Sequence, residues 1–287
     1  MPGQPAVLEL VADLVRAGRV FVLSGAGLST DSGIPDYRSV DGVRRVQPML
    51  YAEFVGSSAA RQRYWARSFI GWERFRAATP NDGHRVVTRL QQRGFLRAVV
   101  TQNVDGLHQL AGADPVVELH GSLAHVVCLS CGTRVRRADV QRELSATNPR
   151  FAEHLVRILP DGSQVSSQIR PDGDIVLPED AVGGFVPPHC PDCGSDSLKP
   201  DVVFFGESVP RGRVDACVAA LEDSRSVLVL GSSLAVMSGY RFVRRAAQLE
   251  LPVAVLTRGP TRGDAETTIK VDGPITPALL ELAARLT

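Results

Sequence analysis

Four cysteines of this chain are arranged as two pairs with the spacing of a metal site. Cys128 and Cys131 enclose two residues and are followed by a glycine, and Cys190 and Cys193 repeat this arrangement farther along the chain. Two Cys-x-x-Cys pairs, each with a glycine that permits a tight turn, are typical of a structural zinc site. Four thiolates leave no coordination position for a substrate or water, so we expect one structural Zn²⁺ per chain, and the chemistry must come from other residues.

A histidine lies just before the first cysteine pair. His120 directly follows the apolar segment 115–119. An imidazole has a pKa of about 6.5, which suits a general base at neutral pH. A histidine at the end of a strand is also commonly a structural residue. His120 is therefore a candidate base whose role depends on which other residues converge on it.

A glycine-rich loop follows the first predicted strand, residues 19–23. The loop contains Gly25 and Gly27 in a Gly-x-Gly arrangement. Such a loop after a first parallel strand lets backbone amides approach a pyrophosphate, which is the basis of dinucleotide binding. Thr30 stands where the third glycine of the full fingerprint is expected. The motif by itself therefore leaves a simple tight turn as the alternative.

Short apolar runs alternate with helical stretches along the rest of the chain. The fold class that this pattern predicts is α/β, a Rossmann-like parallel sheet covered by helices on both faces, with a small zinc-binding module inserted. The predicted strands after the first are residues 97–101, 115–119, 226–230, 252–256 and 268–271, and the clearest helices are 6–17, 81–93, 211–223 and 239–249.

The cysteine spacing and the strand pattern together predict the domain organisation. Residues 1–121 and 201–287 are expected to form the Rossmann-like domain, with a helical insertion at about 39–80. Residues 122–200 are expected to form the zinc-binding module. Polar loops follow three of the strands. Because ligands bind outside the carboxyl ends of parallel strands, we expect these loops and the glycine-rich loop to meet at one crevice.

Composition bounds the remaining possibilities. The 287 residues are 44% hydrophobic and carry 32 basic against 31 acidic side chains, a formal charge of +1. This balance gives no reason to expect nucleic acid or an anionic membrane as partner, and we expect a monomer. The chain shows neither a signal-like amino terminus nor an apolar run long enough for a membrane span, so a cytoplasmic location is expected. Cys217 falls on a predicted apolar helix face and is expected to be a core residue.

Several motifs, in order along the chain, together resemble the sirtuins, which are NAD-dependent protein-lysine deacylases. They are Gly25 to Ser39, Thr101 to His108, His120-Gly121, both cysteine pairs, Lys199 to Glu207 and Gly231 to Leu234. The resemblance extends from about residue 20 to residue 275. Within the family, Arg61 to Trp72 and Gly259 to Arg262 look most similar to class II sirtuins of the mitochondrial lipoamidase and ADP-ribosyltransferase type.

The resemblance implies a reaction and a set of residues. NAD is the expected co-substrate, and the products are nicotinamide, O-acyl-ADP-ribose and free lysine. His120 would be the base that deprotonates a ribose hydroxyl, and Asn103 would share the catalytic centre. The implied NAD-binding residues are Gly25, Ala26, Gly27, Ser29, Asp36, Arg38, Gln102, Asn103, Val104, Asp105, Gly231, Ser232, Ser233, Thr257, Arg258, Gly259 and Ile275.

The substrate side is less determined. The segment from Val203 to Glu207 resembles the part of sirtuins whose backbone pairs with an acyl-lysine peptide or protein. Phe204 and Phe205 can equally be core residues, and at least one of Trp65 and Trp72 is expected to pack a helix rather than line an acyl channel. His84 and His108 are interpreted as structural.

The exact activity stays open at this level. Thr257 stands where many sirtuins carry an asparagine for the adenine ribose. Protein mono-ADP-ribosylation or lipoamidase activity is the alternative to general deacylation, and an NAD-binding module without turnover is the alternative outside enzymes. The acyl preference is not assigned.

Overall fold

The computed structural model describes residues 4–37, 47–151, 173–174 and 182–286. Its described residues fall into two compact units. The first unit takes its members from Met1–Arg45, Thr79–His120 and Val209–Thr287, and the second from Val46–Ala78 and Gly121–Ser208. Residues 47–78 thus pack with the cysteine-bearing part of the chain, whereas the sequence analysis assigns them to a helical insertion of the first domain. The domain boundaries themselves stay a prediction.

The first unit is built on a sheet of six parallel strands. Their order in the sheet is β3-β2-β1-β7-β8-β9. This is the order of doubly wound dinucleotide-binding sheets, and it reverses direction between β1 and β7, where such sheets bind their ligands. The strands are β1 (Val20–Ser24), β2 (Leu96–Thr101), β3 (Val116–Glu118), β7 (Ser226–Leu230), β8 (Val253–Thr257) and β9 (Ile269–Asp272). The predicted α/β fold class is confirmed.

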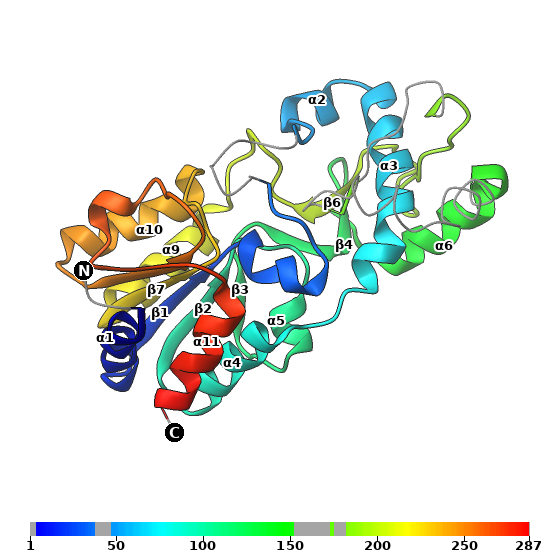
Figure 1. Cartoon of the computed structure of the whole chain (residues 1–287). Helices are drawn as coiled ribbons and strands as arrows, with labels where there is room; N and C mark the ends of the chain where they lie inside the picture. The colour runs from blue at the N-terminus through cyan, green and yellow to red at the C-terminus, as the bar shows by residue number, and fades with distance from the viewer. Residues whose placement is uncertain (1–3, 38–46, 152–172, 175–181, 287) are drawn as a thin grey trace. The chain divides into compact units, whose positions relative to one another are not determined.

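Helices cover both faces of this sheet (Figure 1). Side chains alternate along a strand, so Val20 and Val22 of β1 join one core while Phe21 and Leu23 join the other. All are buried, which explains why the strand reads as a continuous apolar run. The first core also takes in α1 (Gln4–Arg16), α4 (Asp82–Gln92) and α11 (Ile275–Arg285), and the second takes in α9 (Arg211–Glu222) and α10 (Met237–Gln248).

Three short helical elements lie in the loops of this unit. They are η1 (Ala26–Ser32), α5 (Leu107–Leu110) and η3 (Asp264–Glu266). Cys217 lies on α9 and is fully buried in the second core, as predicted, and burial raises the pKa of its thiol to about 11. It is therefore a core residue.

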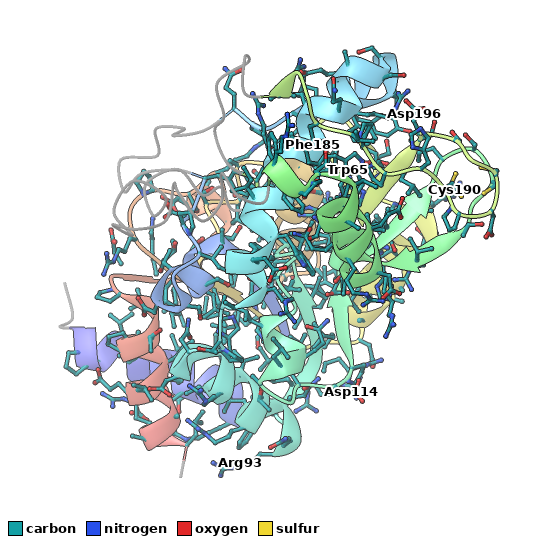
Figure 2. The ribbon with its side chains drawn as sticks, turned by 90° about the vertical axis from the view of Figure 1, so that its right-hand side faces the viewer. Trp65, Arg93, Asp114, Phe185, Cys190 and Asp196 are labelled. Carbon is teal, nitrogen blue, oxygen red and sulfur yellow. The ribbon has the colours of Figure 1, made fainter. Side chains whose placement is uncertain are left out.

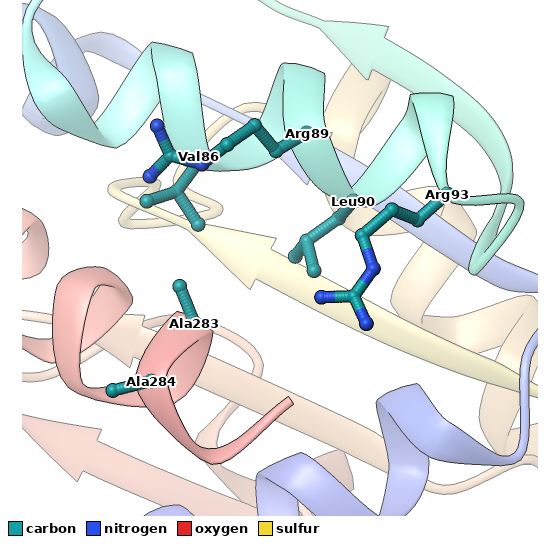
Figure 3. Close-up of a pocket in the computed structure, with 6 residues that line it drawn as sticks. All are labelled: Val86, Arg89, Leu90, Arg93, Ala283 and Ala284. Carbon is teal, nitrogen blue, oxygen red and sulfur yellow. The ribbon is translucent and has the colours of Figure 1, made fainter. Parts of the chain in front are cut away.

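A groove runs between α4 and α11 (Figure 3). Apolar side chains form it together with the stems of two arginines: Val86, Leu90, Ala283, Ala284, Arg89 and Arg93. They extend from the middle of α4 to its C-cap, Arg93, and lie near the carboxyl end of α11. Since α4 leads into β2 and α11 follows β9, the groove lies toward the amino ends of the strands, away from the edge where a parallel sheet binds ligands.

The second unit has its own antiparallel sheet and helices. The sheet order is β5-β4-β6. These strands were not predicted from the sequence, because polar, charged and proline residues interrupt their apolar runs. The elements are β4 (Gly121–Cys128), β5 (Arg134–Arg136), β6 (Leu198–Val202), α2 (Tyr51–Gly56), α3 (Ser58–Arg76) and α6 (Arg137–Thr147).

A buried arginine between two tryptophans organises the core of this unit. The Arg137 guanidinium lies 5.1 Å from the Trp65 ring and 4.8 Å from the Trp72 ring, and burial lowers its pKa to about 10. The Trp65 indole donates a 3.0 Å hydrogen bond to the Leu198 carbonyl, which joins α3 to β6. Trp65 can be followed in Figure 2. It is therefore a packing residue, as expected for at least one of the two tryptophans.

Among the helices that the structure describes, none has a stretch both long and apolar enough to cross a bilayer.

Gly231 provides a test of the backbone packing at the end of β7. Its φ is +64°, and a Cβ atom there would lie 2.4 Å from the backbone nitrogen of Leu28. We expect Gly231→Ala to lower the free energy of unfolding by about 2 to 4 kcal/mol, because both the positive φ and the overlap cost energy. Urea denaturation measures this.

Gly212 is the matched control. It lies on α9, and a Cβ atom at this position would meet no atom within 4 Å. Gly212→Ala should leave stability unchanged or raise it by up to about 1 kcal/mol. Equal effects of the two substitutions would contradict the packing described here.

Candidate active site

The loops after β1 and β7 meet through their backbones. The amide of Gly27 donates a 2.9 Å hydrogen bond to the Gly231 carbonyl. A Cβ atom on Gly25 would lie 2.8 Å from that same carbonyl oxygen, and one on Gly27 would lie 2.9 Å from it. Glycine is thus required at these positions for the contact between the two loops, in addition to any approach of a pyrophosphate.

A buried hydrogen-bond network begins at Ser29 of the glycine-rich loop. The Ser29 hydroxyl donates to an oxygen of Asp105 at 2.7 Å, and the Asn103 amide donates to Ser29 Oγ and to the Gly25 carbonyl, both at 3.0 Å. Burial raises the pKa of Asp105, while the hydrogen bonds from Leu107 and Ser29 oppose that shift. Ser29 therefore holds Asn103 and Asp105 in place, although they lie about 75 positions farther along the chain. All three are predicted to contact NAD.

Two histidines extend this network into the protein interior. His108 Nε2 lies 2.9 Å from the Ser24 hydroxyl, which itself donates to Thr101. The His84 and His108 rings meet edge to face at 5.1 Å, and neither Nδ1 atom has a hydrogen-bond partner among the described residues. Burial lowers the pKa of His84 to about 3 and that of His108 to about 4. Both are neutral at pH 7, in keeping with a structural role.

His120 follows β3 and is held by both ring nitrogens. Nδ1 lies 2.8 Å from the Gln102 carbonyl oxygen and Nε2 lies 2.8 Å from Ser238 Oγ. A carbonyl can only accept, so Nδ1 carries the proton of the neutral ring and Nε2 presents its lone pair. Burial is the main cause that lowers the pKa of His120, and the charge of Arg213 adds to it, while the bond to Gln102 opposes it. The ring is thus neutral at neutral pH, with Nε2 unprotonated.

The side chain of Gln102 connects this histidine to the β7 loop. Its amide donates a 2.8 Å hydrogen bond to Ser232 Oγ, and that oxygen also accepts from the Leu234 amide at 3.2 Å. The contact fixes the Gln102 side chain, whose place beside a ribose stays a prediction. Polar groups from β1, β2, β3 and β7 therefore meet at the carboxyl edge of the sheet.

The remaining predicted residues are distributed around this edge. Ile275 begins α11, and its Cδ1 atom would lie 2.9 Å from a Cβ atom on Gly231. Thr257 is buried at the end of β8, and the amide of Gly259 donates to Asp272. Ala26 belongs to η1, and Val104 and Arg258 lie in the loops after β2 and β8. The Ser233 carbonyl accepts a hydrogen bond from the Arg262 amide. Asp36 is half-buried, and Arg38 lies outside the described residues.

Sequence reasoning did not identify three polar residues of the site. Ser24 and Thr101 are the last residues of their strands, and a polar residue ending an apolar strand was the available signal. Ser238 gave no signal, because its contact with His120 joins residues 118 positions apart.

The four cysteines form one cluster in the second unit. Their sulfur atoms all lie within 4.8 Å of one another, with Cys128 to Cys193 and Cys131 to Cys190 each at 3.6 Å. A tetrahedral site with metal–sulfur bonds of about 2.3 Å has edges of roughly 3.8 Å, so the arrangement fits a metal ion. None of the four is in a disulfide.

Each cysteine pair is closed by a tight turn. The amide of Gly132 donates to the Cys128 carbonyl, and the amide of Gly194 donates to the Cys190 carbonyl, both at 2.9 Å. The two glycines have φ values of +79° and +71°. This conformation is what the glycine after each pair was expected to permit. Cys190 can be followed in Figure 2.

A buried ion pair shapes the segment after β6. Lys199 Nζ lies 3.1 Å from Glu207 Oε2, and that oxygen also accepts from the Phe204 amide at 2.8 Å. Phe204 is buried against Phe54 with ring centroids 5.1 Å apart, so it is the core residue of the Phe204 and Phe205 pair. The chain therefore turns back on itself between residues 203 and 207, and Phe205 pairs with the start of α2 through the Tyr51 amide.

Comparison with known proteins decides the family. The Sir2 family model matches residues 25–238. The chain belongs to the Sir2 family. This Sir2 chain is 50% identical over 287 residues to "NAD-dependent protein deacetylase 1" of Streptomyces coelicolor, covering 100% of this chain and 92% of that protein. It is 46% identical over 276 residues to "NAD-dependent protein deacylase Sirt4" of Drosophila melanogaster, covering 93% and 84%.

Solved structures agree with this placement of the Sir2 chain. A Sir2 structure with a p53 peptide and NAD⁺ superposes with a TM-score of 0.73 at 26% identity, covering 96% of this chain and 97% of that one. The structure of Sir2Tm bound to a propionylated peptide gives a TM-score of 0.72 at 25% identity, covering 98% and 99%. The resemblance stated from the motifs is thereby confirmed.

The two buried neutral histidines predict an acid-sensitive fold. Their folded pKa values lie below the unfolded value, so the unfolded chain binds protons that the folded chain excludes. Stability present above about pH 6.5 should be lost as the pH falls toward the folded values, by about 1.4 kcal/mol per pH unit for each histidine. Urea denaturation between pH 6.5 and 4.5 measures the slope.

The variant His84→Gln isolates one of these contributions. It should reduce the slope by about one proton, because glutamine does not titrate in this range. The same slope in wild type and variant would show that His84 is not held neutral in the folded state.

Proposed function

We propose that the chain is an NAD-dependent protein-lysine deacylase that releases nicotinamide and transfers the acyl group of a modified lysine to ADP-ribose, which leaves free lysine. The observation that carries this proposal is the state of His120. Its Nδ1 proton is fixed by the Gln102 carbonyl, so its unprotonated Nε2 is available as a base at the edge where the strand order reverses. The relatives named above are NAD-dependent deacetylases and deacylases.

The glycine loop and the network beneath it would bind NAD. Bound NAD supplies an electrophilic ribose carbon once nicotinamide departs. Gly25, Ala26, Gly27 and Ser29 would hold the pyrophosphate side, because small residues let the backbone come close. Asn103 and Asp105 would face the nicotinamide side. Their fixed orientation by Ser29 reduces the cost of ordering them on binding.

The rest of the edge would hold the adenosine side. Gly231, Ser232 and Ser233 follow β7, while Thr257, Arg258 and Gly259 follow β8. Ile275 starts α11 beside Gly231, and Asp36, Arg38, Gln102 and Val104 complete the proposed set.

His120 would act by taking a proton. Nε2 accepts it from a ribose hydroxyl, which makes that oxygen a stronger nucleophile toward the acyl carbon. The proton on Nδ1 stays on its bond to the Gln102 carbonyl throughout, so the ring keeps its orientation while its charge changes. Burial and Arg213 lower the pKa of the ring, which keeps it unprotonated until the substrate arrives.

Two features of the second unit would support the reaction without making bonds. Residues 203–207 would pair by their backbone with the acyl-lysine peptide, and the Lys199–Glu207 pair would hold that segment in shape. The four cysteines would bind one Zn²⁺ ion, with Cys128, Cys131, Cys190 and Cys193 as its ligands. A cytoplasmic location and a monomeric state complete the proposal.

Turnover with acylated peptides tests the function. The protein would be incubated with NAD and matched peptides that carry acetyl-, lipoyl-, succinyl- or long-chain-acyl-lysine, and products would be identified by mass spectrometry. We expect nicotinamide, free lysine and O-acyl-ADP-ribose in equal amounts from at least one peptide. His120→Ala should lower kcat by at least about 100-fold, the range of a lost general base.

The controls separate this function from its alternatives. His84→Gln alters a buried histidine that is not proposed as a base, so it should retain far more activity than His120→Ala. ADP-ribose attached to protein without any acylated peptide would instead indicate an ADP-ribosyltransferase. Absence of nicotinamide release with every peptide would reject the deacylase.

Metal content tests the cysteine cluster. We expect one zinc per chain by elemental analysis, and Cys190→Ser should lose it because one thiolate ligand is removed. Limited proteolysis of that variant should cut within residues 121–208, since metal binding contributes folding energy to that unit. Cys217→Ala should keep the full zinc content, because Cys217 belongs to the core of the first unit. Full zinc in Cys190→Ser would refute the site.

A further inference from the structure

Ser238 is placed directly on the proposed base. It is the second residue of α10, the helix that follows the β7 loop, and its hydroxyl oxygen lies 2.8 Å from Nε2 of His120. Neither the motifs nor the buried network beneath the glycine loop includes it. The contact therefore concerns the one ring nitrogen on which the proposed chemistry depends.

The direction of this hydrogen bond follows from the other side of the ring. Nδ1 must donate, because its partner is the Gln102 carbonyl oxygen at 2.8 Å. A neutral imidazole has a single N–H, so Nε2 can only accept. The Ser238 hydroxyl is therefore the donor, and its proton points at the lone pair that would accept the ribose proton.

The residue next to Ser238 supports the opposite side of the same ring. A Cβ atom on Gly239 would lie 2.4 Å from Oε1 of Gln102, so glycine at this position leaves room for the Gln102 side chain. That side chain is fixed by its bond to Ser232 at 2.8 Å. The first turn of α10 thus contacts His120 directly through Ser238 and indirectly through Gln102.

We propose that Ser238 is a positioning residue for His120. Its hydroxyl donates a hydrogen bond to Nε2 and so keeps that nitrogen free of a proton. When NAD binds, the ribose hydroxyl replaces the Ser238 hydroxyl at Nε2. The inference rests on the proposed function for the identity of the base. It adds to that function the residue that keeps Nε2 of His120 oriented and unprotonated before the substrate binds.

Other groups around the His120 ring also favour its neutral form. Arg213 of α9 donates to the Leu119 carbonyl at 3.2 Å, and it is the charged group whose field lowers the pKa of His120. Gln102 and Ser238, which contact the two ring nitrogens, are uncharged. A donor to Nε2 stabilises the neutral imidazole relative to the charged one, so it also lowers the pKa. Loss of the Ser238 hydroxyl should therefore raise the pKa of His120.

The test follows His120 in the full chain by two readouts. The first is the imidazole ¹⁵N and ¹H resonances against pH, which report the pKa and the protonated nitrogen without any need for turnover. The second is the pH profile of kcat/KM for the best acyl-lysine peptide. The variants are Ser238→Ala, which removes the hydroxyl, and Ser238→Thr, which keeps one.

Ser224→Ala is the matched control. The Ser224 hydroxyl donates to the Ala220 carbonyl at 2.7 Å, near the amino end of β7, at the other edge of the sheet. Its removal should leave the His120 resonances and the pH profile as in wild type. Thermal unfolding of each variant checks that the fold is retained.

In Ser238→Ala we expect the pKa of His120 and the acidic limb of kcat/KM to move up together by about half a unit to one unit. At pH values below the wild-type pKa of His120, kcat/KM should fall by roughly 3- to 10-fold, and the loss should shrink toward pH 8.5. Ser238→Thr should bring both the pKa of His120 and kcat/KM most of the way back to the wild-type values.

Other results would overturn the proposal. An unchanged pKa of His120 in Ser238→Ala, a loss of kcat/KM equal at every pH, or an equal loss in Ser238→Thr would each do so. If the wild type released no nicotinamide, the proposed function would fail, but the resonances would still decide whether Ser238 holds Nε2. The two failures are therefore distinguishable.

Discussion

The backbone contact between Gly27 and Gly231 is the constraint on which the candidate site depends. It joins the loops after β1 and β7 at the place where the strand order reverses. Both loops can come this close only because neither residue has a Cβ atom. Once the loops are in register, Ser29 reaches the residues after β2, and Ser232 reaches Gln102. The orientation of the proposed base then follows from Gln102.

Burying the polar side chains of the site costs folding free energy, and the proposed chemistry explains why they are buried. Asp105 and the histidines at positions 84, 108 and 120 are polar groups in surroundings that disfavour their charged forms. Each is held by hydrogen bonds to other residues, which offsets part of the cost of burial. A low local dielectric also makes each remaining interaction stronger. A rigid set of polar groups is what a reaction that relies on positioning requires.

The two units were predictable from the sequence to different degrees. Buried parallel strands are nearly continuous apolar runs, so all six strands of the first sheet could be placed to within about two residues. The antiparallel strands of the second unit are not continuous apolar runs: β4 includes Ser122 and His125, and β6 contains Lys199, Pro200 and Asp201. Period and propensity give little signal there, because the cysteine cluster and the buried Arg137 organise that unit.

By itself, the sequence determined which residue types are present and in which order. The cysteine spacing, the glycine-rich loop and the segment around His120 are local patterns, and local patterns are sufficient to indicate the sheet, the cysteine cluster and the family. Only the tertiary structure decided which nitrogen of His120 is unprotonated and what holds it. Its two partners lie 18 and 118 positions away in the chain. Protonation and orientation depend on burial and on hydrogen bonds between distant segments, and these exist only after the chain has folded.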